Sequence, residues 1–290
     1  MVNRIWHNHF GRGIVGSTSD FGVMGDRPAN PQLLDYLASA FVENGWSVKK
    51  IHRLIMLSSV YRESSALQSE AGAADADNQL LWRYERHRAE AEVIRDSMLF
   101  VSGRLNAKMG GPGVYPPLPQ GVSSGGRYGG WKTEKDLAEG ERRSVYVFVK
   151  RNMVYPMFEA FDAPNHEETC ARRFRTVIPS QALMLMNDEL VLDWSRALAE
   201  RLLNDGGLLP EQQVERAYRL VLSRAPNAAE REEVLGFLGR QTSLLGERLA
   251  RNEKVPVPGK LPAGVEPARA AALMDFCHVL LNSNEFLYVN

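Results

Sequence analysis

Apolar residues recur at the helical period of about 3.6 residues over much of this chain. Across residues 31–62 the pattern breaks once, at Asn44 and Gly45, which favour a left-handed stop. Asn30 can cap the first segment, whose first residue is a proline, and Ser47 can cap the second. We therefore predict two helices joined as a hairpin.

The same period predicts helices in other parts of the chain. Val2, Ile5, Trp6 and His9 share one face of an N-terminal helix, and His9 is then half-buried near its C-terminus. Further helices are expected over 93–105, over 183–203 with a break at Asn187–Asp188, over 214–222, after the capping box of Asn227 and Glu230, and beyond a proline- and glycine-containing linker at 252–267.

Three segments lack the helical period. Residues 63–77 indicate a surface loop, and residues 110–131 are rich in proline and glycine and indicate a long coil or lid. The β-branched and aromatic run over 144–149 predicts a strand. The expected fold is mainly α: one multi-helix globular domain over 1–290, with a small β element and a possible subdivision into 1–178 and 179–290.

Composition narrows the classes of function. The 290 residues are 44% hydrophobic, and 35 basic residues balance 35 acidic ones, so no overall field draws the chain to nucleic acid or acidic lipid. No apolar stretch is long enough for a membrane span, and no signal-peptide pattern opens the chain. Two cysteines are too few for a four-cysteine zinc site, and no CxxCH haem-attachment motif is present.

Individual motifs point to no activity by themselves. Gly11 to Gly16 match GxGxxG, but no buried strand precedes them and no helix follows, so we interpret them as a glycine-rich turn. We predict no metal ligands, since residues two apart, such as His7 and His9, diverge on a helix. Cys277 is expected to be a buried thiol, with a disulfide to Cys170 or a metal as the alternatives.

Arginine-rich clusters with nearby carboxylates are the more unusual chemical feature. Their planar forks suit bidentate capture of carboxylate, sulfate or phosphate, and clusters converging beside residues 110–131 would form an anion-binding groove. The alternative is internal or solvated ion pairing, because the charges balance locally.

Several strings together resemble one known family. They are Asn3-Arg4-Ile5-Trp6, Phe10-Gly11-Arg12-Gly13-Ile14-Val15, Leu54-Ile55-Met56, Tyr61-Arg62, Arg142-Arg143-Ser144-Val145-Tyr146, Pro179-Ser180-Gln181-Ala182-Leu183 and Leu281-Asn282-Ser283-Asn284-Glu285-Phe286. The chain resembles, over essentially all 290 residues, the planctomycete cytochrome-c-associated C-terminal domain, domain-of-unknown-function family 1553.

The resemblance implies which domains accompany the chain and where in the cell it works. In that family the domain usually follows a haem-binding cytochrome c domain and a second uncharacterised domain in large exported proteins, often encoded near sulfatase-like proteins. It implies periplasmic or extracytoplasmic work on polysaccharides. This chain is expected to be truncated at its N-terminus relative to the family, so haem c is implied only for a companion domain and no cofactor is expected in the chain itself.

The family supplies no established catalytic residues, so the candidates are polar groups within the family-like strings. Our leading hypothesis is an accessory domain that binds anionic, sulfated or uronic, glycans. The alternatives are a glycan-active hydrolase or lyase, with His9 or Asp162 as general base, and a structural scaffold that docks a cytochrome domain. The expected ligand-binding residues are Arg4, Arg88, Arg143 and Arg173.

Overall fold

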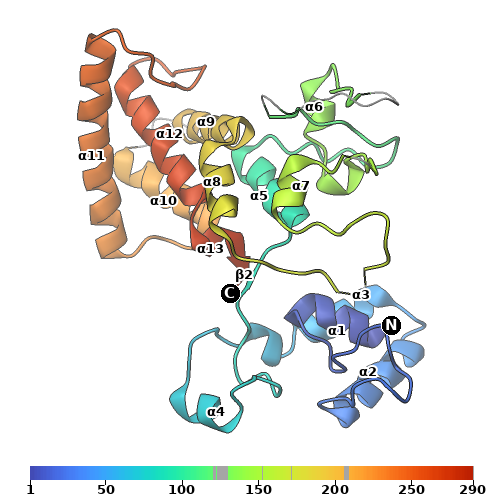
Figure 1. Cartoon of the computed structure of the whole chain (residues 1–290). Helices are drawn as coiled ribbons and strands as arrows, with labels where there is room; N and C mark the ends of the chain where they lie inside the picture. The colour runs from blue at the N-terminus through green and yellow to red at the C-terminus, as the bar shows by residue number, and fades with distance from the viewer. Residues whose placement is uncertain (120–121, 123–129, 152, 171, 206–208, 290) are drawn as a thin grey trace. The chain divides into compact units, whose positions relative to one another are not determined.

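The computed structural model describes residues 1–119, 122, 130–151, 153–170, 172–205 and 209–289 (Figure 1). The chain forms two compact units. Unit 1 comprises Met1–Arg88, Thr169–Arg173 and Tyr288–Asn290, and unit 2 comprises Ala89–Glu168 and Phe174–Leu287. Thirteen α-helices and one two-stranded sheet lie in the described residues, which confirms the mainly α fold. In that part of the chain, no helix is long and apolar enough to cross a bilayer.

Unit 1 is built on three helices, α1 (Val2–Phe10), α2 (Pro31–Glu43) and α3 (Val48–Met56). The side chain of Asn30 accepts a hydrogen bond from the backbone N–H of Leu33, and Ser47 accepts one from Lys50. Gly45 adopts a left-handed φ of 68° between the two helices. The predicted hairpin and its caps are therefore confirmed.

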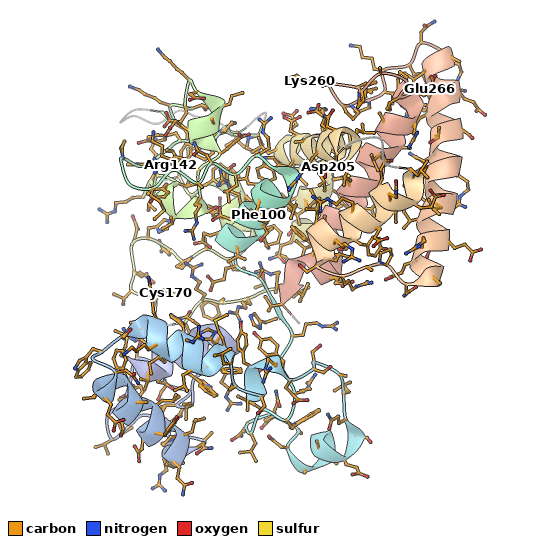
Figure 2. The ribbon with its side chains drawn as sticks, turned by 180° about the vertical axis from the view of Figure 1, so that it is seen from behind. Phe100, Arg142, Cys170, Asp205, Lys260 and Glu266 are labelled. Atoms are coloured by element: carbon orange, nitrogen blue, oxygen red, sulfur yellow. The ribbon has the colours of Figure 1, made fainter. Side chains whose placement is uncertain are left out.

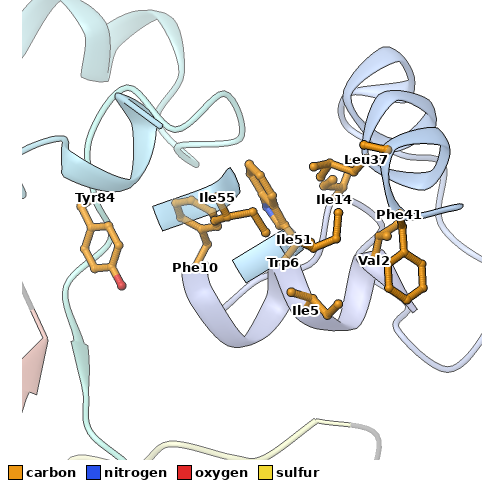
Figure 3. Close-up of a cluster of buried hydrophobic side chains, with 11 residues drawn as sticks. Val2, Ile5, Trp6, Phe10, Ile14, Leu37, Phe41, Ile51, Ile55 and Tyr84 are labelled. Atoms are coloured by element: carbon orange, nitrogen blue, oxygen red, sulfur yellow. The ribbon is translucent and has the colours of Figure 1, made fainter. Parts of the chain in front are cut away.

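The core of unit 1 gathers the apolar faces of these helices. Figure 3 shows Trp6 and Phe10 of α1 beside Ile51 and Ile55 of α3. The ring centroids of Trp6 and Phe10 lie 4.3 Å apart. The other buried members of the cluster are Val2, Ile5, Ile14, Leu37, Ala40, Phe41 and Tyr84.

The rest of unit 1 contains short elements. They are the 3₁₀ helix η1 (Val60–Arg62), α4 (Ser69–Ala74) and β1 (His87–Arg88), which pairs antiparallel with β2 (Tyr288–Val289). The prediction of a loop throughout 63–77 was wrong where α4 forms. Its alanines favour a helix. A Cβ at Gly72 would lie 3.5 Å from the Trp82 ring, so the short helix packs against this ring, which the local pattern does not reveal.

Unit 2 is a set of helices around α9 and α12. The helix α12 packs against both α9 and α11, and α5 packs against α9. The predicted break near Asn187 and the capping box of Asn227 with Glu230 are confirmed. Its helices are α5 (Ala91–Ser102), α6 (Leu137–Gly140), α7 (Pro156–Ala160), α8 (Pro179–Asn187), α9 (Glu189–Asn204), α10 (Pro210–Leu222), α11 (Ala228–Ala250), α12 (Pro267–Leu281) and α13 (Asn284–Leu287).

The predicted strand over 144–149 was wrong. Ser144–Tyr146 form the 3₁₀ helix η2, and Val147 makes only an isolated parallel bridge with Val114. Strand propensity needs a neighbouring strand and a buried face, whereas Val145 is 73% exposed and the bridge spans one residue. The observed division into units also differs from a boundary near residue 178, because α5 packs against α9 across that position.

Candidate functional site

The structure distributes the predicted site residues between the two units. Unit 1 contains Arg4, His9, Arg88 and Arg173, whereas unit 2 contains Arg143 and Asp162. Arg88 is buried in β1, Arg173 is half-buried, and each already has an interaction within the chain. Each unit therefore has its own set of candidate residues.

In unit 2, Asp162 holds a turn. Its carboxylate accepts hydrogen bonds from the backbone N–H of Thr176 at 2.8 Å and from the Thr176 hydroxyl at 2.8 Å. The Nε2 group of Gln181 also reaches the Ala160 carbonyl at 3.0 Å. Asp162 adopts a left-handed φ of 62°, so both its backbone conformation and its carboxylate stabilise the turn. This arrangement favours a structural role over that of a general base.

Two arginines that were not among the predicted ligands are fully buried in unit 2. The guanidinium of Arg95 donates to the carbonyl oxygens of Gly140 at 2.6 Å and Arg142 at 2.9 Å, and to Ser144 Oγ at 3.2 Å. Asp96 accepts from the backbone N–H and hydroxyl of Ser144 at 2.7 and 2.6 Å. Arg95 therefore ties α5 to the segment that precedes η2.

Arg142, labelled in Figure 2, joins that segment to the start of the Gly/Pro-rich loop. Only 1% of its side chain is exposed. Its guanidinium donates to the carbonyl oxygens of Lys108, Gly110 and Pro112 and lies 3.9 Å from the ring centroid of Tyr146. This arginine therefore stabilises backbone and cannot also bind an external anion.

Arg143, the neighbouring predicted ligand, is more accessible. Its side chain is 53% exposed, and its Nε lies 3.8 Å from Asp96 Oδ2. Residues 120–121 and 123–129 of the predicted groove lie outside the described residues. The groove near residues 110–131 therefore stays a prediction.

In unit 1, a hydrogen-bonded loop lies against α1. The buried side chain of Asn3 donates to the Val15 carbonyl at 3.0 Å and accepts from the Val15 N–H at 2.9 Å. A Cβ at Gly13 would meet the Asn3 amide at 2.8 Å and the Val15 carbonyl at 2.4 Å, so only glycine fits there. Asn3 and Gly13 together fix the start of the loop on the helix.

The next residues of this loop are held by local hydrogen bonds. The Ser17 hydroxyl donates to the Asp20 carbonyl at 2.8 Å and accepts from the Asp26 N–H at 2.8 Å. The Ala29 N–H donates to the Ile14 carbonyl at 2.8 Å, which closes the loop at its base. The glycine-rich segment is thus an ordered turn and not a dinucleotide motif, as its context predicts.

A hollow of about 270 Å³ opens between this loop and the start of α1. Arg4 is exposed there and makes no ion pair among the described residues. Phe21 is 61% exposed, although an aromatic ring is ordinarily buried. The hollow is lined by Met1, Asn3, Arg4, Thr18, Ser19 and Phe21.

Comparison with known proteins identifies the family of the chain. A family model described as "PSD1: Protein of unknown function (DUF1553)" matches residues 1–238. The chain belongs to this family. The string at 281–286 lies beyond the matched residues, so the family match is shorter than the resemblance over 290 residues predicts. No curated protein and no solved structure matches the chain.

A second polar feature of this DUF1553 chain joins α1 and α3. Nε2 of His9 lies 2.7 Å from Nδ1 of His52, and the ring centroids are 4.9 Å apart at an interplanar angle of 66°. Burial lowers the pKa of the His9 imidazole below its usual value, and the nearby His52 lowers it further. In this contact one of the two facing nitrogens donates a hydrogen bond and the other accepts it.

The cysteines of this DUF1553 chain are both free thiols, which answers the open question of a disulfide. Cys277 is buried in α12, and burial raises the pKa of its thiol well above the usual range. Cys170, labelled in Figure 2, is exposed, and its Sγ lies 3.2 Å from the carbonyl oxygen of Arg172. Cys277 is therefore a buried free thiol of the core and does not form a disulfide.

Proposed function

We propose that this DUF1553 chain is a binding domain that takes one anionic sugar residue, uronic or sulfated, in the hollow beside α1. The observation that carries the proposal is the exposed Arg4, which has no ion pair among the described residues and lines a hollow with an exposed aromatic ring. Of the predicted ligand-binding residues, Arg4 alone lines this hollow.

The chemistry of the lining fits such a ligand. An arginine fork binds carboxylate or sulfate through two parallel N–H groups, and an aromatic face can cover the apolar C–H face of a sugar ring. The exposed hydroxyl of Ser19 supplies a polar group beside them. A hollow of about 270 Å³ is at the small end of ligand sites and therefore suits a single ring.

The loop is ordered independently of any ligand. Asn3 and Ser17 hold it by bonds within the chain, so few degrees of freedom are lost when a sugar binds. Preorganisation of this kind lowers the entropic cost of association. The site is therefore expected to bind without a large rearrangement.

The test is calorimetric titration of the full chain with uronic, sulfated and neutral oligosaccharides. We expect the anionic oligosaccharides to bind and the neutral ones to bind at least about tenfold more weakly, because a charge-assisted hydrogen bond contributes about 1.5–3 kcal/mol. Arg4→Gln should remove this preference, and Phe21→Ala should weaken binding of every sugar.

Arg53→Gln is the matched control, because Arg53 is also an exposed helical arginine of unit 1 but does not line the hollow. It should bind like the wild type. Absence of binding by every anionic oligosaccharide, or unchanged affinity in Arg4→Gln, would contradict the proposal.

We further propose, from the family resemblance, that the domain works outside the cytoplasm beside a cytochrome c domain and a second companion domain, with haem c carried by the former. A binding domain in that position would hold an acidic polysaccharide near its partners. Size-exclusion chromatography of the chain mixed with these two domains is the test. Co-elution is expected, and separate elution at micromolar concentrations would contradict the proposal.

A further inference from the structure

We propose that His9 and His52 form a two-imidazole binding site for a divalent transition metal ion in unit 1. The facing nitrogens, His9 Nε2 and His52 Nδ1, are 2.7 Å apart and come from different helices. The site is distinct from the hollow proposed to bind sugars, because neither histidine lines that hollow.

The first argument is the placement of the two nitrogens. α1 and α3 pack against each other through the buried core of unit 1, so the backbone positions of both histidines are fixed. Each facing nitrogen can offer a lone pair to a metal ion when the proton of its ring is on the other ring nitrogen. On metal binding, the proton between the facing nitrogens would move to the other nitrogen of its own ring or to solvent, so that both facing nitrogens bind the ion.

The second argument is the distance. A zinc ion with Zn–N bonds of about 2.0–2.1 Å and tetrahedral geometry separates its two nitrogen ligands by about 3.3 Å. Binding therefore needs an increase of about 0.6 Å from the observed 2.7 Å. It also needs each imidazole to turn by about 35°, because a tetrahedral ion lies to one side of the line that joins the two nitrogens.

The third argument is support of the His9 ring by its neighbours. The ring of Tyr61 meets it edge-on at 87°, with centroids 5.3 Å apart, and the Tyr84 hydroxyl donates to the His9 carbonyl at 2.9 Å. The Tyr61 ring packs against the His9 imidazole itself, whereas the bond from Tyr84 fixes the His9 backbone. Both histidines are half-buried, so one side of the pair remains open to water.

The donor set identifies the class of metal. Imidazole nitrogen suits zinc, copper and nickel, whereas magnesium and calcium prefer oxygen. Among the described residues no group of three or more histidine, cysteine or acidic side chains could hold a metal ion, so water or an external ligand must complete the coordination. With two protein ligands, the site is more open than a four-ligand structural zinc site, so we expect a bound metal ion to exchange readily with solution.

The test uses the full chain with Zn²⁺ or Cu²⁺ as the probe. We expect calorimetry at pH 7.5 to show one saturable Zn²⁺ site per chain. Paramagnetic resonance of the Cu²⁺-loaded protein should show two nitrogen donors. His9→Gln and His52→Gln, which keep a polar side chain, should each weaken binding at least about tenfold, as loss of a ligand requires.

His166→Gln is the control, because His166 is an exposed histidine of unit 2. It should retain the wild-type affinity and nitrogen count. If His9→Gln fails to fold, His52→Gln and the nitrogen count of the wild type still decide the question. The proposal is overturned if the wild type shows no saturable site, if one nitrogen alone coordinates copper, or if both variants bind like the wild type.

Discussion

At the scale of single residues, buried arginines determine how the irregular part of unit 2 is held. Arg142 binds three carbonyl oxygens of the loop that precedes residue 113, and Arg95 binds the segment before η2. In this region, whose described residues include few helices and no strand, the guanidinium N–H groups of both arginines bind backbone carbonyl oxygens that a neighbouring strand would otherwise bind. Arg142 therefore has a structural role inside unit 2, whereas the side chain of its sequence neighbour, Arg143, is half exposed.

Arg142→Met should therefore destabilise unit 2 strongly. It keeps apolar bulk but removes three charge-assisted hydrogen bonds to loop carbonyl oxygens, and we expect a loss of about 3 kcal/mol or more in the free energy of unfolding. Urea unfolding followed by circular dichroism measures it. Arg143→Met is the matched control and should change that free energy by less than about 1 kcal/mol. Equal losses in the two variants would contradict this role for Arg142.

The two thiols should react very differently. Burial keeps the Cys277 thiol protonated by raising its pKa, whereas Cys170 is exposed. Because the thiolate is the nucleophile, iodoacetamide at pH 8 should modify Cys170 in the native chain and Cys277 only after denaturation. Peptide mass spectrometry locates the label. Equal labelling of both cysteines in the native protein would show that α12 opens readily.

Sequence reasoning at the residue scale succeeded where a signal is local. The pattern of α1 places Arg4 outside the buried face, and Asn30, Ser47 and Asn227 were identified as caps. The hollow could not be predicted, because it depends on the pairing of Asn3 with Val15 across a loop. The His9–His52 contact was missed for the same reason, since no local spacing relates residues on different helices.

At the scale of elements, the start of α11 combines a cap with an ion-pair network. Hydrogen bonds from Arg224, and then from the backbone of Asn227, hold the pKa of Glu230 down to about 2. Arg224 also reaches Glu285 at 2.6 Å, which links the start of α11 to α13. One guanidinium therefore fastens two helix termini that are far apart in the sequence.

This network predicts a dependence of stability on pH. The pKa of Glu230 is depressed in the folded state, so its contribution is fully present above the unfolded pKa of about 4.3 and is lost as pH falls through about 2. Between pH 5 and pH 2 the wild type should lose more stability than Glu230→Gln. Thermal unfolding across that range measures the difference. Parallel curves for the two proteins would contradict the assignment.

The elements themselves were predictable to different degrees. Helices with a long period and a cap, such as α2, α3 and α11, were found because propensity, pattern and capping agree. The strand predicted over 144–149 was wrong because, among the described residues, Val114 is its only bridge partner. The helix α4 is too short for a periodic signal.

At the scale of the whole molecule, each unit has a core of its own. Ile51 of α3 is fully buried in unit 1, so Ile51→Ala should cost about 2–5 kcal/mol and should lower amide hydrogen-exchange protection across α1, α2 and α3. Leu54→Ala on the same helix is the control, and its loss should be markedly smaller because Leu54 is 38% exposed. An equal loss of protection in α9 and α12 would contradict separate cores.

The pairing of β1 with β2 also constrains the order in which parts of the chain can fold during translation. His87 and Arg88 leave the ribosome early, and all of residues 89–287 must be translated before Tyr288 and Val289 emerge. Closing so long a loop is slow, because its entropy must be lost before the pairing forms. The helices α1, α2 and α3 can therefore pack long before β1 finds its partner, whereas unit 2 is completed only when Leu287 emerges, directly before β2.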